Sequence, residues 1–286
     1  MIRSFASASI LALGFLAHAQ ETIFFQAHRG GLEEVAENTL AAVRYAWSIE
    51  GAVPEIDIQT TNDGHFVILH DATLARTTDA PDAIKQKPVS TLTLDQVRSC
   101  DAGIKFGAQY KGERVPTLDE VFDEMMSNPA RRIYLDVKSA DFAKLSDQIA
   151  ARGIGNRVLF VHGDPKKCAE LRALTPEAGA MTWLSGTPDR IKTRFEELRQ
   201  INFAGLTQLQ FHLHTKNNDT STEFELDEEF LREAMRATKA ANVDLQIRPF
   251  NLDPVCLKKL LDLGITWYVA DAPRKLVDAV QAARKP

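Results

Sequence analysis

The sequence predicts an α/β fold in the form of a (β/α)8 TIM barrel. Short β-rich runs alternate with helical patterns along the 286 residues, which indicates repeated βα units and a parallel sheet. Eight of these runs suit parallel strands, each followed by a helical segment, and no linker divides the chain. We expect the eight strands at 23–27, 54–58, 133–137, 158–161, 180–183, 204–209, 244–247 and 267–270.

The predicted helices carry apolar residues at three- and four-residue spacing. The first opens near Glu37, continues through Leu40, Val43 and Trp47, and is stopped by Gly51. The later helices are expected at 118–126, 141–151, 165–174, 188–199, 228–241, 254–263 and 274–283.

The run 66–69 begins too soon after strand 54–58 to be parallel to it, because a parallel crossover needs a dozen or more residues. We therefore expect an antiparallel β-hairpin that turns at 62–64 and places Glu55 roughly opposite His70. Residues 72–115 show little periodicity apart from one short helix near 94–98. A loop of this length is usually functional, so we predict a small insertion, about 59–115, over the active face.

The first nineteen residues have the features of a secretory signal peptide. Arg3 precedes an apolar run at 10–16, and Ala17-His18-Ala19 is a small-x-small cleavage site. The apolar run is shorter than the ~20 residues of a membrane-spanning helix. We expect cleavage after Ala19, a single barrel domain over 20–286, a secreted or periplasmic protein and no integral membrane segment after cleavage.

Composition excludes several other classes of protein. The net charge is −5 and no basic run occurs, which argues against a nucleic-acid partner. The three cysteines are odd in number and form no CxxC motif, so neither a zinc ribbon nor a disulfide scaffold is indicated. The cysteines are buried free thiols, or Cys168 and Cys256 form a bridge. No protein partner is evident.

Polar residues gather at the carboxyl ends of the predicted strands, where the active sites of such barrels lie. Glu55 and Asp57 are two residues apart and share a face, as do Asp136 and Lys138. Converging carboxylates repel each other when buried unless a cation binds. An all-oxygen ligand set suits Mg2+ or Ca2+ better than zinc, although Glu-x-Asp alone is also typical of a solvated strand edge. Further polar residues at strand ends are His28, His162, His212, His214, Arg248 and Asp271.

These residue types suit chemistry at a phosphate group. A divalent ion held by the carboxylates, together with Lys138 and Arg29, would neutralise phosphoryl oxygens. Two histidines could take a proton from the nucleophile and give one to the leaving alkoxide, because their unperturbed pKa lies near neutrality. The sequence therefore predicts a small-molecule phosphodiester as substrate.

Several short motifs follow one another over nearly the whole chain: His28-Arg29-Gly30, Glu37-Asn38-Thr39, Glu55-Ile56-Asp57, Asp63-Gly64, His70-Asp71, 74–78, 112–118 and 270–273. In this order they resemble the motifs of the glycerophosphodiester phosphodiesterase family. The resemblance implies a TIM barrel with an insertion after the His-Asp strand and a metal-dependent phosphodiesterase. It also implies that His28 and His70 are the acid–base pair, that Glu55 and Asp57 are metal ligands and that Arg29 contacts phosphate.

The chain departs from the family pattern at three places. The family usually has glutamate where Asp136 stands, and aspartate is shorter by one methylene. Arg248-Pro249-Phe250-Asn251 and His162 also differ from the common residues, which leaves the alcohol of the substrate open. Residues expected around the metal or at the substrate are Glu37, Asn38, Asp71, His162 and Arg248.

The expected activity is metal-dependent hydrolysis of a glycerophosphodiester to glycerol 3-phosphate and an alcohol. One alternative is an activity on lipids like that of lysophospholipase D or sphingomyelinase D. The other is a non-catalytic barrel that binds a metal or phosphate, which intact histidines at 28 and 70 disfavour.

Overall fold

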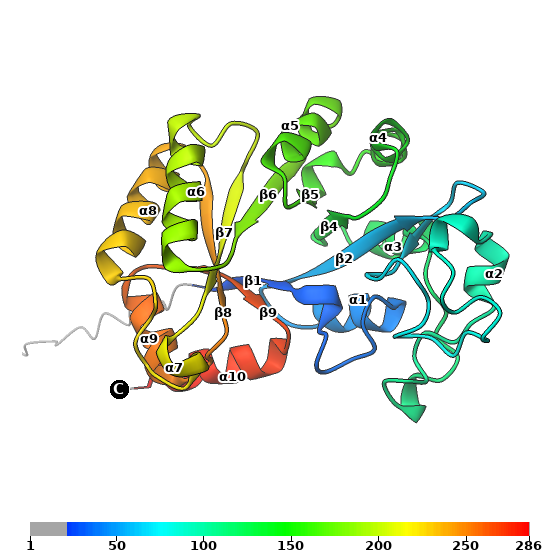
Figure 1. Ribbon diagram of the computed structural model, residues 1–286, viewed down its shortest axis with the longest axis horizontal. Helices are drawn as coiled ribbons and strands as arrows, with labels where there is room; N and C mark the ends of the chain where they lie inside the picture. The colour runs from blue at the N-terminus through cyan, green and yellow to red at the C-terminus, as the bar shows by residue number, and fades with distance from the viewer. Residues whose placement is uncertain (1–21, 286) are drawn as a thin grey trace, which may run out of the picture.

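A closed barrel of parallel strands forms the centre of the computed structural model, which describes residues 22–285 (Figure 1). The sheet runs in the order β1-β9-β8-β7-β6-β5-β4-β2-β3, and β1 also pairs with β2. Because β1 pairs with both β9 and β2, the parallel strands close on themselves and the predicted TIM barrel is confirmed. The strands are β1 (Phe24–Ala27), β2 (Ala52–Thr60), β3 (Phe66–Ile68), β4 (Ile133–Val137), β5 (Val158–Val161), β6 (Gly179–Leu184), β7 (Gln208–Leu213), β8 (Asp244–Pro249) and β9 (Trp267–Ala270).

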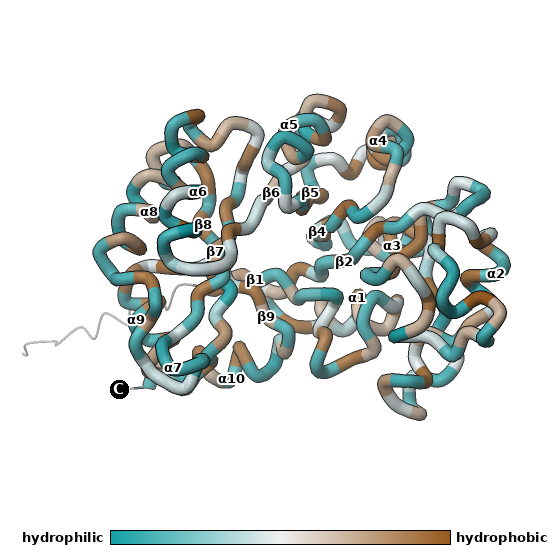
Figure 2. Tube along the Cα trace, in the orientation of Figure 1, coloured by the Kyte–Doolittle hydropathy of each residue, from teal (hydrophilic) through white to brown (hydrophobic). Residues whose placement is uncertain are grey.

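Helices surround the barrel and turn their apolar faces toward it. Figure 2 shows hydrophilic and hydrophobic residues alternating along outer helices such as α6 and α8, and α8 buries Phe230, Leu231 and Ala234. This alternation supplies the outer half of the core. The helices are α1 (Leu40–Trp47), α2 (Leu94–Arg98), α3 (Leu118–Met126), α4 (Phe142–Ala151), α5 (Pro165–Leu174), α6 (Pro188–Gln200), α7 (Lys216–Asp219), α8 (Glu228–Ala240), α9 (Pro254–Asp262) and α10 (Pro273–Ala283).

Two predicted boundaries differ from the structure by more than two residues. Helix α1 begins at Leu40 rather than near Glu37, because the hydroxyl of Thr39 accepts the Ala42 N–H and caps the helix there. Strand β7 lies about four residues later than the predicted 204–209. Residues 202, 203 and 205 have φ values of 49°, 52° and 84°, a left-handed backbone that cannot continue a strand.

The predicted antiparallel hairpin is confirmed, but its register is shifted by one residue. The Thr61 N–H donates to the His65 carbonyl at 2.9 Å and closes the turn. The β2–β3 pairing sets Ile58 opposite Ile68, one residue away from the register that would place Glu55 opposite His70.

The insertion after β3 builds a small apolar core of its own. The short helix predicted near 94–98 is present as α2, and the segment closes over the outside of the hairpin. The buried residues of this core include Val67, Leu69, Leu74, Val89, Leu92, Val97, Cys100 and Val115.

Other predictions concern cysteines and the membrane. All three cysteines are buried and free, so the alternative of a bridge between Cys168 and Cys256 is wrong. Among residues 22–285, no helix is long and apolar enough to cross a bilayer. The predicted signal peptide at 1–19 lies outside the described residues and stays a prediction.

Candidate active site

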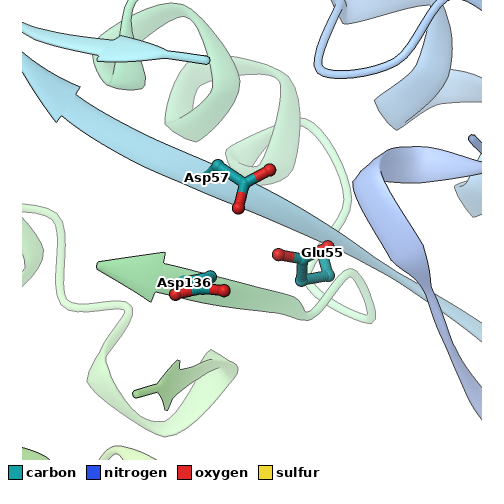
Figure 3. Close-up of side chains that lie close together, drawn as sticks. All are labelled: Glu55, Asp57 and Asp136. Atoms are coloured by element: carbon teal, nitrogen blue, oxygen red, sulfur yellow. The ribbon is translucent and has the colours of Figure 1, made fainter. Parts of the chain in front are cut away.

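Three buried carboxylates meet at the carboxyl end of two neighbouring barrel strands. Figure 3 shows Glu55 and Asp57 on β2 facing β4, which carries Asp136, and strand pairing sets Asp57 beside Asp136. One oxygen of each carboxylate lies within 4.8 Å of the others. Their exposed fractions are 1%, 0% and 9%. The predicted ligand set is therefore assembled in one place.

This cluster fits a hard divalent cation. Burial, followed by the charges of Asp57 and Asp136, raises the pKa of Glu55 well above its usual value. Burial likewise raises the pKa of Asp136. The Asp57 Oδ1 atom is buried and makes no hydrogen bond. A divalent cation would relieve the repulsion and add a partner for this atom besides the ammonium of Lys138. Carboxylate oxygens are the donors that Mg2+ and Ca2+ prefer.

The loop after β1 holds two of the carboxylates through its backbone and an amide. Arg29 has φ +52°, and its N–H donates to Glu55 Oε2 at 2.7 Å. Asn38 donates from Nδ2 to Asp57 Oδ2 at 2.8 Å, and its Oδ1 accepts the Asp57 N–H at 3.1 Å. Gly30 is needed between them, because a Cβ there would lie 2.6 Å from Ala42 Cβ.

Two cations border the carboxylates. Lys138 Nζ lies 2.5 Å from Asp136 Oδ2 and 3.1 Å from Asp57 Oδ1. Burial acts to lower the pKa of Lys138, but these two negative charges outweigh it and raise the pKa. Arg29 donates to Glu37 Oε1 at 3.1 Å, and its buried Nε has no hydrogen-bond partner. Both cations are placed to contact an anionic ligand above the carboxylates.

His28 follows β1 and is held by the far end of the chain. Its Nδ1 lies 2.6 Å from Asp271 Oδ1, and Arg248 donates to both oxygens of that carboxylate at 2.9 and 2.8 Å. Burial lowers the pKa of His28, the bond to Asp271 acts to raise it, and the charge of Arg248 lowers it further. With Nδ1 donating to Asp271, Nε2 is the atom left to exchange a proton.

His70 follows β3 and is held locally. Its Nδ1 lies 2.7 Å from Asp71 Oδ1, and Arg76 donates from Nε to Asp71 Oδ2 at 2.7 Å. Arg76 also donates to both oxygens of Glu37, at 2.6 and 2.8 Å. The same Glu37 accepts from Arg29, so an ionic chain joins His70 to the loop that holds Glu55 and Asp57.

The groups face a cavity of about 340 Å³ at the barrel mouth. Asp57 does not line the cavity and is held by Asn38, while Glu37 and Asp71 bind the wall residues Arg29 and His70. His162 is the exception among the predicted residues, since its Nδ1 accepts the N–H of Asp164 in its own loop and it does not line the cavity. The lining includes His28, Arg29, Glu55, His70, Asp136, Lys138, Gln210, His212 and Arg248.

Sequence reasoning missed the roles of three residues. Asp271 was recognisable as a polar residue after a strand, but only barrel closure brings it to His28. Arg76 lies in a matching segment, and its bonds to Glu37 and Asp71 depend on how the insertion folds back. Gln210 lines the cavity from inside a strand, and no sequence signal marks it.

The fold and the site are those of a TIM barrel whose mouth holds three carboxylates that could bind a cation and two histidines that each contact an aspartate. The sequence profile of the glycerophosphoryl diester phosphodiesterase family matches residues 28–275. The chain belongs to this family, which confirms the resemblance of its motifs.

Two relatives of the chain are named glycerophosphodiester phosphodiesterase. A glycerophosphodiester phosphodiesterase from Caldanaerobacter subterraneus subsp. tengcongensis is 42% identical over 113 residues, which is 40% of this chain and 44% of that protein. The chain thus spans less than half the length of this relative. A glycerophosphodiester phosphodiesterase from Bacillus altitudinis is 29% identical over 262 residues, which is 88% of this chain and 95% of that protein.

Solved structures share the fold over most of their length. A glycerophosphodiester phosphodiesterase from Agrobacterium tumefaciens superposes with a TM-score of 0.68 at 19% identity, covering 90% of this chain and 100% of the other. A phosphodiesterase from Oleispira antarctica, determined with the product sn-glycerol-3-phosphate, has a TM-score of 0.64 at 25% identity, covering 90% of this chain and 96% of the other.

Proposed function

We propose that the protein hydrolyses glycerophosphodiesters to glycerol 3-phosphate and an alcohol, using a divalent cation. The observation that carries this proposal is the shared cavity, in which the carboxylates at 55 and 136 and the histidines at 28 and 70 face one space. Family membership and the glycerol 3-phosphate held by the Oleispira antarctica relative support this substrate class.

The cation would be held by Glu55, Asp57 and Asp136. When bound, Mg2+ or Ca2+ supplies positive charge against the phosphoryl oxygens. Lys138 and Arg29, which border the cluster, add donors for the same oxygens and orient the phosphate at the metal wall of the cavity.

The two histidines would move the protons. One Nε2 takes a proton from the attacking water as its oxygen forms a new bond to phosphorus. The other Nε2, already protonated, gives a proton to the alkoxide oxygen as the old P–O bond breaks. The aspartates at Nδ1 fix the ring orientation and stabilise whichever imidazole carries the positive charge.

The test is a panel of glycerophosphodiesters and lysolipids assayed with Mg2+, with Ca2+ and with excess EDTA. We expect turnover of glycerophosphodiesters that EDTA abolishes and one of the ions restores. Asp57→Asn should remove metal binding in calorimetry and turnover together. Asp123→Asn, an exposed aspartate on α3, is the matched control and should leave both unchanged.

Three results would contradict the proposal in different ways. Full turnover in excess EDTA would remove the role of the cation. Turnover of lysolipids alone would favour the lipid activity. Metal binding without turnover of any compound in the panel would favour a non-catalytic barrel.

A further inference from the structure

A chain of hydrogen-bonded side chains runs through the barrel interior, where branched apolar residues are the usual filling. The chain starts at the cavity, and each side chain donates to the next; we call it the polar chain. All of its members except His212 are buried. The polar chain consists of His212, Gln210, Gln246, Tyr134 and Gln208.

Every bond of the polar chain points in the same direction. Gln210 Nε2 donates to Gln246 Oε1 at 2.7 Å, and Gln246 Nε2 donates to the Tyr134 hydroxyl at 3.4 Å. Tyr134 then donates to Gln208 Oε1 at 2.9 Å. Gln210 Nε2 also donates to Gln26 Oε1 at 3.2 Å, which uses its second proton. Gln210 is therefore left with only its Oε1 to offer to His212.

This arrangement fixes the tautomer of His212. Its Nε2 lies 3.1 Å from Gln210 Oε1, and because a carbonyl oxygen can only accept, Nε2 carries the proton. Phe250 packs edge-on against the ring, with centroids 5.6 Å apart, and holds its plane. Burial, helped by the charge of Arg248, lowers the pKa of His212 to about 4, so the ring is neutral near pH 7.

The second nitrogen of His212 is then a free acceptor. In neutral imidazole with a protonated Nε2, Nδ1 carries a lone pair, and it has no hydrogen-bond partner among residues 22–285. His212 lines the cavity, while Arg29 and Lys138 offer only donors to it. His212 thus supplies what a ligand hydroxyl needs, an acceptor held in a fixed position.

The position of His212 selects which part of a ligand it meets. Strand β7 lies four strands away from β2 around the barrel in either direction, so His212 stands across the mouth from Glu55 and Asp57. A ligand whose phosphate lies at the carboxylate wall would extend its organic group toward β7. We propose that His212 Nδ1 accepts a hydrogen bond from a glycerol hydroxyl of the bound phosphoester and so selects polyol phosphates over deoxy analogues.

This inference rests on the proposed substrate class, and its test distinguishes a failure of the inference from a failure of the proposed function. Binding of sn-glycerol 3-phosphate and of n-propyl phosphate, which lacks both hydroxyls, is measured by calorimetry with Mg2+ or Ca2+ present. We expect the wild type to prefer glycerol 3-phosphate by roughly threefold to tenfold, the range of one neutral hydrogen bond. Because no turnover is needed, a protein inactive on every diester but showing this preference would fail the proposed function and keep the inference.

Variants at position 212 assign the preference to the nitrogen. His212→Phe keeps a ring against Phe250 but has no acceptor, and it should bind both ligands with equal affinity. His212→Asn places Oδ1 near the position of Nδ1 and should retain the preference. His65→Phe, an exposed histidine in the hairpin turn, is the matched control and should behave as wild type.

Binding and spectroscopy can each overturn the proposal. In binding, the contrary result is a wild type without preference, including one that binds neither ligand, or a His212→Phe variant that keeps the preference. In spectroscopy, 15N spectra of the imidazole should show protonated Nε2 and unprotonated Nδ1 at neutral pH. The opposite tautomer would mean that the polar chain runs in the reverse direction and that Nδ1 is a donor.

Discussion

The two histidines at the cavity mouth have the same kind of partner but obtain it from different parts of the molecule. Each Nδ1 meets an aspartate, and each aspartate is bound by an arginine. The two sets are His28 with Asp271 and Arg248, and His70 with Asp71 and Arg76.

The His28 set depends on closure of the barrel. Asp271 follows β9 and Arg248 lies in β8, so they reach His28 only because β1 pairs with β9. The His70 set is local, since Asp71 is the next residue and the arginine comes from the insertion. The side chain of His28 is 15% exposed and that of His70 is 33% exposed. The comparison indicates that His28 is the less exposed histidine and is held by distant strands, while His70 is more exposed and is held by the insertion.

The largest effect should come from removing either histidine. His28→Ala and His70→Ala should each lower kcat by roughly 10²-fold or more, because each proton transfer is lost. Metal binding in calorimetry should remain, since neither side chain belongs to the carboxylate cluster. Near-normal turnover in both variants would remove the acid–base assignment, and a large loss in only one would show that the two sets are unequal in function.

A smaller effect should follow from the aspartates, and here the two sets should differ. Asp271→Asn removes a charge-assisted bond to a buried ring and should cost about 10- to 100-fold in kcat. Asp71→Asn should cost less, because water can reach His70 and Arg76 keeps Glu37 as a partner. Both losses are measured as kcat at saturating substrate. Equal losses, or a greater loss for Asp71→Asn, would contradict the view that the less exposed His28 depends more on its aspartate than His70 does.

The same contrast explains what sequence reasoning could and could not predict. The Glu-x-Asp pair on one strand and the Asp-x-Lys pair on the next were predictable, because strand alternation and parallel pairing place them together. The Asp71 partner of His70 is adjacent in sequence. The Asp271 partner of His28 is 243 residues away and needs the closed barrel. The sequence therefore predicted both histidines of the cavity but only one of the two aspartates that hold them.

The start of strand β7 was predicted wrongly, because the amino-acid composition of the segment does not show its backbone conformation. The apolar run that begins at Ala204 looks like a strand, yet left-handed residues before and within it delay β7 to Gln208. That shift places His212 inside the strand rather than after it, with its Nε2 bonded to Gln210. Only the three-dimensional register shows that this histidine is part of the barrel interior as well as of the cavity wall.

The smallest expected effect is a shift of one limb of the pH–kcat profile. It tests whether the charge of Arg248 sets the pKa of His28. The positive charge of Arg248 acts to lower the pKa of His28, with Arg248 Nη2 3.4 Å from His28 Nδ1. Arg248→Met removes that charge, so the pKa of His28 should rise. The limb of the pH–kcat profile that His28 sets should therefore move to higher pH, whether the reaction requires this histidine neutral or protonated.

Arg248→Lys separates charge from shape in this prediction. It keeps the positive charge beside Asp271 but loses the planar guanidinium, so its limb should stay near that of the wild type. Arg248 also lines the cavity, so both variants could change substrate affinity. A change in affinity that is the same at every pH does not move the limb. A limb that moves to lower pH in Arg248→Met, or equally in both variants, would show that the charge of Arg248 does not set the proton affinity of His28.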